Sequence, residues 1–220
     1  MIRGALLIAL AALLWATTGI VAKFLFTGSE LQATSLGFLR LVVALPFFFA
    51  LMLRERIAEA RSARSESRPA WKLTRKALVP LLALGVFQAI YQGSYLLAVD
   101  LTGAGIATLI ALCLAPVLVA IMAAPLLGEK PGLVTILALM AAIAGTAMLV
   151  ISDIDSAGEL RLAGILIAVL AAFVYAGFTL TRRHRSAGAP VFTTAFMCFL
   201  TASVFLLPVV WGIGGFDGMA

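Results

Sequence analysis

The sequence predicts an all-α polytopic membrane protein with seven transmembrane helices. Of its 220 residues, 63% are hydrophobic and 12% are charged, whereas roughly one quarter of the residues of a soluble domain are charged. A spanning helix needs about 20 mainly apolar residues. Runs of this kind follow one another at 4–26, 34–53, 77–99, 103–127, 133–151, 162–181 and 191–211. Little sequence remains for a soluble domain.

The first run, 4–26, follows Arg3 directly, as the apolar part of a secretory signal peptide follows its basic residues. It is longer than the apolar part of a signal peptide, and no clear cleavage site of small residues closes it before Lys23. We therefore expect this run to remain in the membrane as an anchor.

The basic residues predict the orientation. Thirteen of the sixteen lysine and arginine residues lie at the N-terminus or in the segments after the second, fourth and sixth runs. Such residues collect on the cytoplasmic side of membrane proteins. The N-terminus is therefore expected in the cytoplasm, and seven spans place the C-terminal end of this chain in the periplasm.

The net charge of +6 is accordingly a sign of topology and of contact with the lipid bilayer. The most basic segment, 54–76, has Trp71 as its one aromatic residue and lies where anionic headgroups would be. Nucleic acid is not expected as a partner.

The second run, 34–53, carries Arg40 well inside it. Counted from Gln32 near the outer end, Arg40 lies roughly 12 Å into a hydrocarbon core about 30 Å thick. A cation at this depth faces the protein interior and meets a carboxylate, a helix C-terminus or a ligand. No Asp or Glu lies well inside the spans. A substrate carboxylate is one candidate partner, and backbone carbonyls freed by Pro46 or Pro116 are another. The alternative is a structural role, in which Arg40 ties helices together.

The third run, 77–99, has polar groups on one face, because their spacing is three and four residues. They are Gln88, Tyr91, Gln92 and Tyr95. Buried amides need hydrogen-bond partners, so this face is predicted to line a water-filled cavity; hydrogen bonding to neighbouring helices is the alternative. Trp15 in the first run needs a partner for its indole N–H and is a further candidate for the cavity wall.

The fourth run, 103–127, has a small residue at every fourth position. These residues are Gly103, Ala107, Ala111 and Ala115. A face of this kind lets another helix approach closely. Pro116 interrupts the run and is expected to bend it toward a bundle whose helices satisfy the freed carbonyl. The turn at 128–131 only reverses the chain, so runs 103–127 and 133–151 are expected to form a hairpin.

The sixth and seventh runs resemble the first two. Residues 164–183 align with residues 4–23. Matched pairs include Gly4 with Gly164, Trp15 with Tyr175, Lys23 with Arg183 and Pro46 with Pro208. The repeat unit then has five helices, and an odd number inverts the second copy, as in many secondary transporters. The chain divides into a complete repeat at 1–151 and the first two helices of a second, inverted repeat at 162–220.

The sequence contains several short motifs: Trp15-Ala16-Thr17-Thr18, Phe38-Leu39-Arg40-Leu41 with Ala44, Ala115-Pro116-Val117, Gly128-Glu129-Lys130 and Gly145. Together they resemble the drug/metabolite transporter superfamily, in its EamA-like branch. The resemblance covers residues 1–151, and the spacing from Pro116 to Glu129 is its most specific part. It implies ten helices in two inverted repeats, and movement of small metabolites, often outward, across the bacterial inner membrane.

We therefore expect a secondary transporter, an exporter of small molecules such as amino acids, organic acids or drugs, that works by alternating access. The second repeat stops after two helices, so the alternative is a C-terminally truncated, non-transporting fragment or a half-transporter. A half-transporter would need a completing chain as its partner, and a homodimer is also open.

Other function classes are not expected. The sequence has no cluster of metal ligands, no glycine-rich phosphate loop and no nucleophile with a base, so we expect no catalytic residue, cofactor or metal. Cys113 and Cys198 both lie inside spans, which argues against a disulfide framework. A retinal photoreceptor would need a lysine in its last helix, and the run 191–211 has none.

Overall fold

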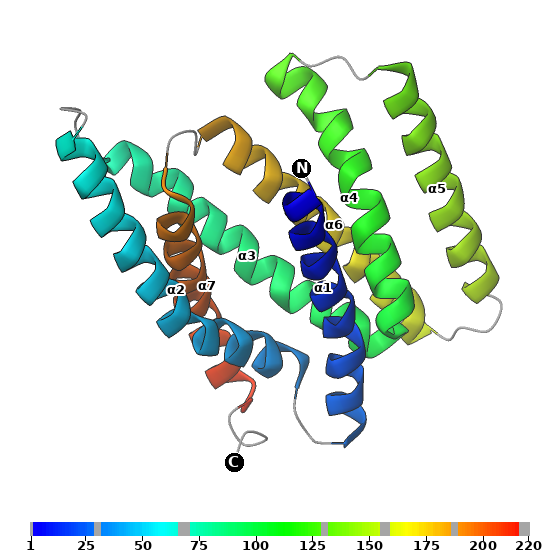
Figure 1. Ribbon diagram of the computed structural model, residues 1–220. Coiled ribbons are helices and arrows are strands. Elements are labelled where there is room, and N and C mark those ends of the chain that lie inside the picture. The colour runs from blue at the N-terminus through cyan, green and yellow to red at the C-terminus, as the bar shows by residue number, and fades with distance from the viewer. Residues whose placement is uncertain are drawn as a thin grey trace.

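The computed structural model describes residues 2–28, 32–65, 71–128, 132–154, 159–185 and 189–215, and these are almost entirely helical. The helices are α1 (Ile2–Gly28), α2 (Ala33–Ser65), α3 (Arg75–Thr102), α4 (Ala104–Leu127), α5 (Leu133–Ile154), α6 (Glu159–Arg185) and α7 (Val191–Gly212). No strand occurs in the described ranges. Successive helices run in opposite directions, as they must in a chain that crosses a membrane repeatedly (Figure 1). The prediction of an all-helical protein is confirmed.

Five segments are long and apolar enough to span a membrane. They lie at Ala33–Ser65, Arg75–Thr102, Ala104–Leu126, Leu162–Arg183 and Val191–Gly212. The described apolar part of α5, Leu133–Met148, is shorter. The layout of seven spans thus goes beyond these five and stays a prediction.

α2 continues well past its predicted span. It is helical to Ser65 because the residues after 53 are rich in arginine, glutamate and alanine, which have high helix propensity. Trp71 folds back onto this extension: Arg56 Nη1 donates to its carbonyl oxygen at 2.8 Å, and Trp71 N donates to Glu59 Oε1 at 2.8 Å. The guanidinium of Arg56 also lies over the indole, 5.2 Å from the ring centroid.

The extension of α2 also holds the start of α7. Glu55 accepts hydrogen bonds from the backbone N–H groups of Phe192 at 3.0 Å and Thr193 at 2.8 Å, and from the Thr193 hydroxyl at 3.1 Å. The first N–H groups of a helix have no partner within that helix. A carboxylate there is also favoured by the helix dipole. Glu55 therefore fixes the end of α7 to α2, although the two are distant in sequence.

α3 is the central helix of the bundle. It packs most extensively on α6 and also on α7, while α2 packs on α7 and α4 packs on α6. α5 packs on α4 at the outer edge of the bundle, and α1 makes only sparse contacts with α2, α3 and α4 (Figure 1). The two helices of the predicted second repeat, α6 and α7, thus pack extensively on helices of the first repeat.

The crossing of α3 and α7 depends on a glycine. A Cβ added at Gly85 would overlap the Cβ of Thr201, and it would lie 2.7 Å from Thr201 Cγ2 and 3.0 Å from the Cys198 carbonyl oxygen. The crossing of α3 and α6 is similar, since a Cβ at Gly164 would lie 2.7 Å from Leu101 Cβ. Backbones approach this closely only where a side chain is missing.

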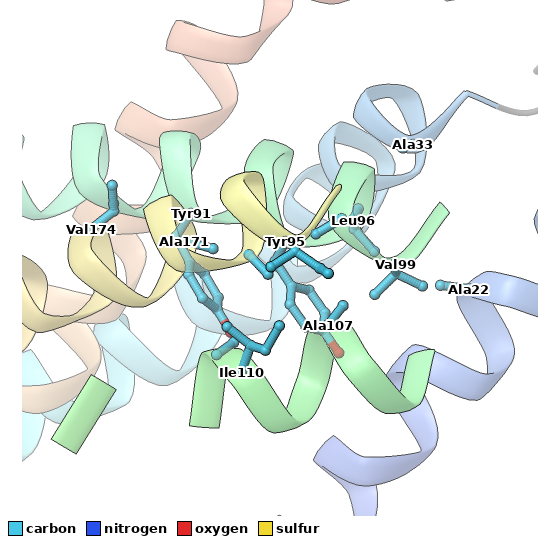
Figure 2. Close-up of a cluster of buried hydrophobic side chains, with 14 of the residues drawn as sticks. Ala22, Ala33, Tyr91, Tyr95, Leu96, Val99, Ala107, Ile110, Ala171 and Val174 are labelled. Carbon is cyan, nitrogen blue, oxygen red and sulfur yellow. The ribbon is translucent and has the colours of Figure 1, made fainter. Parts of the chain in front are cut away.

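The small-residue face of α4 lies in the main hydrophobic cluster. Ala107, Ala111 and Ala115 are buried. Ala107 and Ala111 share this cluster with α3 residues and with Ala171 of α6, as Figure 2 shows for Ala107 and Ala171. The predicted hairpin partner, α5, does touch α4. However, the described part of α5 contributes no residue to this cluster.

The remaining predicted packing residues have other positions. Gly103 separates α3 from α4, with φ +89°, and an added Cβ there would meet no atom within 4 Å. Gly103 ends α3 with ψ 158°, and its N–H donates to the Val99 carbonyl oxygen; this backbone conformation is open essentially to glycine alone. Pro46 and Pro116 both lie on exposed sides of their helices.

Candidate functional site

A polar cavity of about 440 Å³ lies among five helices. Its walls come from α1, α2, α3, α6 and α7. They are formed by Leu14, Thr18, Arg40, Ala44, Gln88, Tyr91, Gln92, Tyr175 and Phe199. The cavity thus lies between the predicted first repeat and the two helices that follow it. Such sites between helices of a bundle are common binding sites for small molecules.

Arg40 is the charged group of this cavity. Its side chain is half-buried, and its Nη1 atom is buried with no hydrogen-bond partner in the described part of the chain. Arg40 also borders two neighbouring hollows. One, of about 320 Å³, lies between α1 and α2, and the other, of about 370 Å³, lies along α2 itself. None of the described residues that line the three hollows is acidic.

Aromatic rings fix one wall of the cavity. Tyr91 lies against Tyr175, with ring centroids 5.3 Å apart at 45°, and stacks on Tyr95 at 5.7 Å and 13°. Tyr175 in turn stacks on Phe178 at 6.2 Å. Tyrosines held by ring contacts on both sides form a rigid surface on which an apolar part of a solute can rest.

The structure brings together Arg40, Gln88, Tyr91 and Gln92, as their helical spacing suggests. Tyr95 shares that face of α3 but does not line the cavity. Its hydroxyl forms a 2.8 Å hydrogen bond with Thr108 Oγ1 of α4, and its ring lies in the hydrophobic cluster (Figure 2). Tyr95 therefore packs against the ring of Tyr91 and connects the cavity wall to α4.

Five lining residues were not among the predicted site residues: Leu14, Thr18, Ala44, Tyr175 and Phe199. The signal for Tyr175 was present, because it aligns with Trp15 in the predicted repeat. The Trp15 side chain itself lies outside the described part of the structure. Thr18 Oγ1 donates to the Leu14 carbonyl oxygen at 3.4 Å, so its hydroxyl is also engaged within α1.

At the end of the bundle where α1 and α3 finish, hydrogen bonds join the helices. Lys23 Nζ donates to the Asp100 carbonyl oxygen at 2.8 Å, which connects α1 to the last turn of α3. This is a favourable place for a cation, since the carbonyls at a helix C-terminus carry partial negative charge. Lys23 therefore does not add a second positive charge to the cavity lining.

Comparison with known proteins agrees with this arrangement. Residues 2–151 match the model of the EamA-like transporter family. The chain is also 28% identical over 208 residues to a Bacillus subtilis (strain 168) protein named "Uncharacterized transporter YwfM". That alignment covers 94% of this chain but 64% of the relative, so the chain spans a little under two thirds of the relative's length. No solved structure matches.

The match and the helices together indicate the kind of protein. The family match covers more than half of the chain and includes Arg40, Gln88, Tyr91 and Gln92 of the cavity. The apolar helices indicate a multi-pass membrane protein, and the relative is named as a transporter. This protein belongs to the EamA-like transporter family.

Proposed function

We propose that this chain forms the substrate-binding part of a secondary transporter that exports small metabolites across the bacterial inner membrane. The observation that supports this proposal best is the cavity, whose lining comes from α1, α2 and α3 and also from α6 and α7. Polar and charged side chains inside membrane spans are costly in lipid, and they generally mark a pathway for a solute or ion. Arg40, Gln88 and Gln92 are such side chains.

Alternating access is the proposed mechanism. The predicted repeat at 1–151 and the inverted partial repeat at 162–220 meet at the cavity, because α6 and α7 pack on α2, α3 and α4. Repeats related in this way can exchange conformations about a central site, which then opens to each side of the membrane in turn. In this scheme the chain contributes seven spans, with α1 and α5 crossing the membrane in addition to the five longest apolar segments.

The proposed topology has the N-terminus in the cytoplasm and the end of this chain in the periplasm. The basic extension of α2 then lies at the cytoplasmic face, beside the start of α7 to which Glu55 connects it. We expect alkaline phosphatase fused after residue 215 to be active and the same enzyme fused after residue 65 to be inactive. Activity at both fusion points, or at residue 65 alone, would contradict this topology.

The second candidate function is a half-transporter that works only with a completing chain or with a second copy of itself. It is favoured by the sparse contacts of α1 with the rest of the bundle. The two candidates differ in whether the chain alone can move a solute.

Counterflow in proteoliposomes tests the proposal. The purified chain is reconstituted, the vesicles are loaded with one unlabelled solute from a panel of amino acids, organic acids and neutral metabolites, and uptake of the labelled solute is followed. We expect accumulation above that of protein-free vesicles for at least one class of solute. Accumulation only after co-reconstitution with the remaining helices of a full-length relative would favour the half-transporter. No accumulation in either case would overturn both candidates.

A further inference from the structure

We propose that the cavity selects organic anions that carry one carboxylate, and that it discriminates against zwitterions and cations. In this proposal Arg40 binds the carboxylate. The proposal rests on the proposed function, because it names the class of solute that the transporter's cavity would take. It follows from the charges on the cavity wall and from the state of the Arg40 side chain.

The first argument is the unsatisfied guanidinium. Arg40 Nη1 is buried and makes no hydrogen bond within the described residues. A buried charged donor without a partner is costly. A carboxylate supplies two oxygens in the geometry of the guanidinium fork, so it would satisfy Arg40 better than a neutral carbonyl. One guanidinium neutralises one carboxylate, and a dianion would carry a second negative charge into the cavity without a counter-charge.

The second argument concerns the ammonium group of an amino acid. The described lining has one cation and no acidic residue. The acidic residues of the helices that form the walls lie near helix ends: Glu55 and Glu59 in the extension of α2, Asp100 near the end of α3 and Glu159 at the start of α6. Both Glu55 oxygens already accept hydrogen bonds from the start of α7. An ammonium bound against this wall would therefore lack a counter-charge, which is unfavourable where the solute displaces water.

The third argument is the shape of the remaining lining. Tyr91, Tyr175 and Phe199 present apolar ring surface, and Gln88 and Gln92 add neutral amides. The volume of about 440 Å³ lies within the usual range for small-molecule sites. The cavity therefore suits a small acid with a non-polar body, whose carboxylate points to Arg40 and whose body rests on the rings.

Four ligands with similar hydrocarbon bodies test this charge preference. They are 3-phenylpropionate (anion), phenylalanine (zwitterion), 3-phenylpropanamide (neutral) and 3-phenylpropylamine (cation). Binding to the 220-residue chain in nanodiscs of neutral lipid is measured by calorimetry. We expect 3-phenylpropionate to bind about tenfold or more tightly than each of the other three, as expected for a charge-assisted pair. Equal affinity for phenylalanine and 3-phenylpropionate would overturn the proposal.

Variants assign the preference to Arg40. Arg40→Gln should bring the affinity for 3-phenylpropionate down to that for the amide, and Arg40→Lys should keep part of the preference because the charge remains. Arg64→Gln removes the same charge from an exposed position on α2 and should change nothing. If Arg40→Gln does not yield a monodisperse protein, the comparison of Arg40→Lys with wild type decides. An unchanged preference in the Arg40 variants would exclude Arg40 as the anchor.

The same measurements separate this proposal from the proposed function. If the proteoliposomes transport neutral and anionic solutes equally well, and Arg40→Gln changes neither, the transport proposal stands and the anion selectivity is wrong. If anions bind through Arg40 but no solute is moved, the selectivity stands and the transport proposal is wrong.

Discussion

Replacing Gly85 with alanine should destabilise the helix bundle by about 1–3 kcal/mol or more, the usual cost of forcing extra atoms into a packed interior. The new methyl group would overlap the Thr201 side chain and lie 3.0 Å from the Cys198 carbonyl oxygen. Neither α3 nor α7 can yield easily at this point, because α7 also packs on α2 and is held at its start by Glu55. We expect a clear fall in the midpoint of thermal unfolding in detergent, followed by the loss of the monodisperse peak in size-exclusion chromatography.

Gly93→Ala is the matched control on the same helix. An added Cβ at Gly93 meets no atom within 4 Å, so only the gain in helix propensity from glycine to alanine remains, up to about 1 kcal/mol. The control should therefore leave the midpoint unchanged or raise it. A second change, Thr201→Gly, should recover part of the stability that Gly85→Ala loses. If Gly85→Ala melts at the wild-type temperature, the close crossing of α3 and α7 is wrong.

The helices themselves could be predicted from hydropathy, but their full lengths could not. The apolar run at 34–53 predicts the membrane-spanning part of α2, yet the helix continues to Ser65. Hydropathy responds to lipid, whereas helix formation after residue 53 depends on backbone propensity and on the contacts of Arg56 and Glu59 with Trp71. Patterns of apolar residues therefore locate spans more reliably than they locate helix ends.

The choice of packing partner was the least predictable part of the fold. The every-fourth-residue pattern of Ala107, Ala111 and Ala115 correctly indicates a face that another helix approaches closely. It does not say which helix, because any small-residue face accepts any other. The next helix in sequence, α5, is the obvious candidate, yet α4 packs more extensively on α6. The glycines that permit the closest crossings, Gly85 and Gly164, have no distinctive local pattern.

The candidate site was predictable in part, for a physical reason. Arg40, Gln88, Tyr91 and Gln92 stand out because polar groups inside an apolar span need an explanation, and the structure gathers all four around one cavity. Tyr95 has the same helical spacing, but it lies one turn nearer the junction of α3 and α4, where its hydroxyl forms a hydrogen bond with Thr108. Phe199 and Ala44 are ordinary apolar residues of membrane helices. Only the three-dimensional arrangement makes them part of the wall.

Filling the cavity should weaken transport strongly while leaving the fold intact. Ala44 lines the cavity beside Arg40 and is half-buried. In Ala44→Phe the new ring would occupy space that the solute needs, and Ala44 itself belongs to neither hydrophobic cluster. An overpacking cost of about 1–3 kcal/mol on the bound state corresponds to a roughly fivefold or greater loss of affinity. We expect counterflow and binding of 3-phenylpropionate to fall together by at least this factor.

The thermal midpoint distinguishes a blocked cavity from a damaged fold. Ala50 lies on the same helix at an exposed position outside the three hollows, so Ala50→Phe adds the same ring on the outer surface of α2. It should leave binding, counterflow and the midpoint near those of wild type. Ala44→Phe should share that midpoint and differ in binding and transport alone. Wild-type counterflow in Ala44→Phe would argue against a solute path beside Arg40, because Ala44 borders two of the three hollows that Arg40 borders.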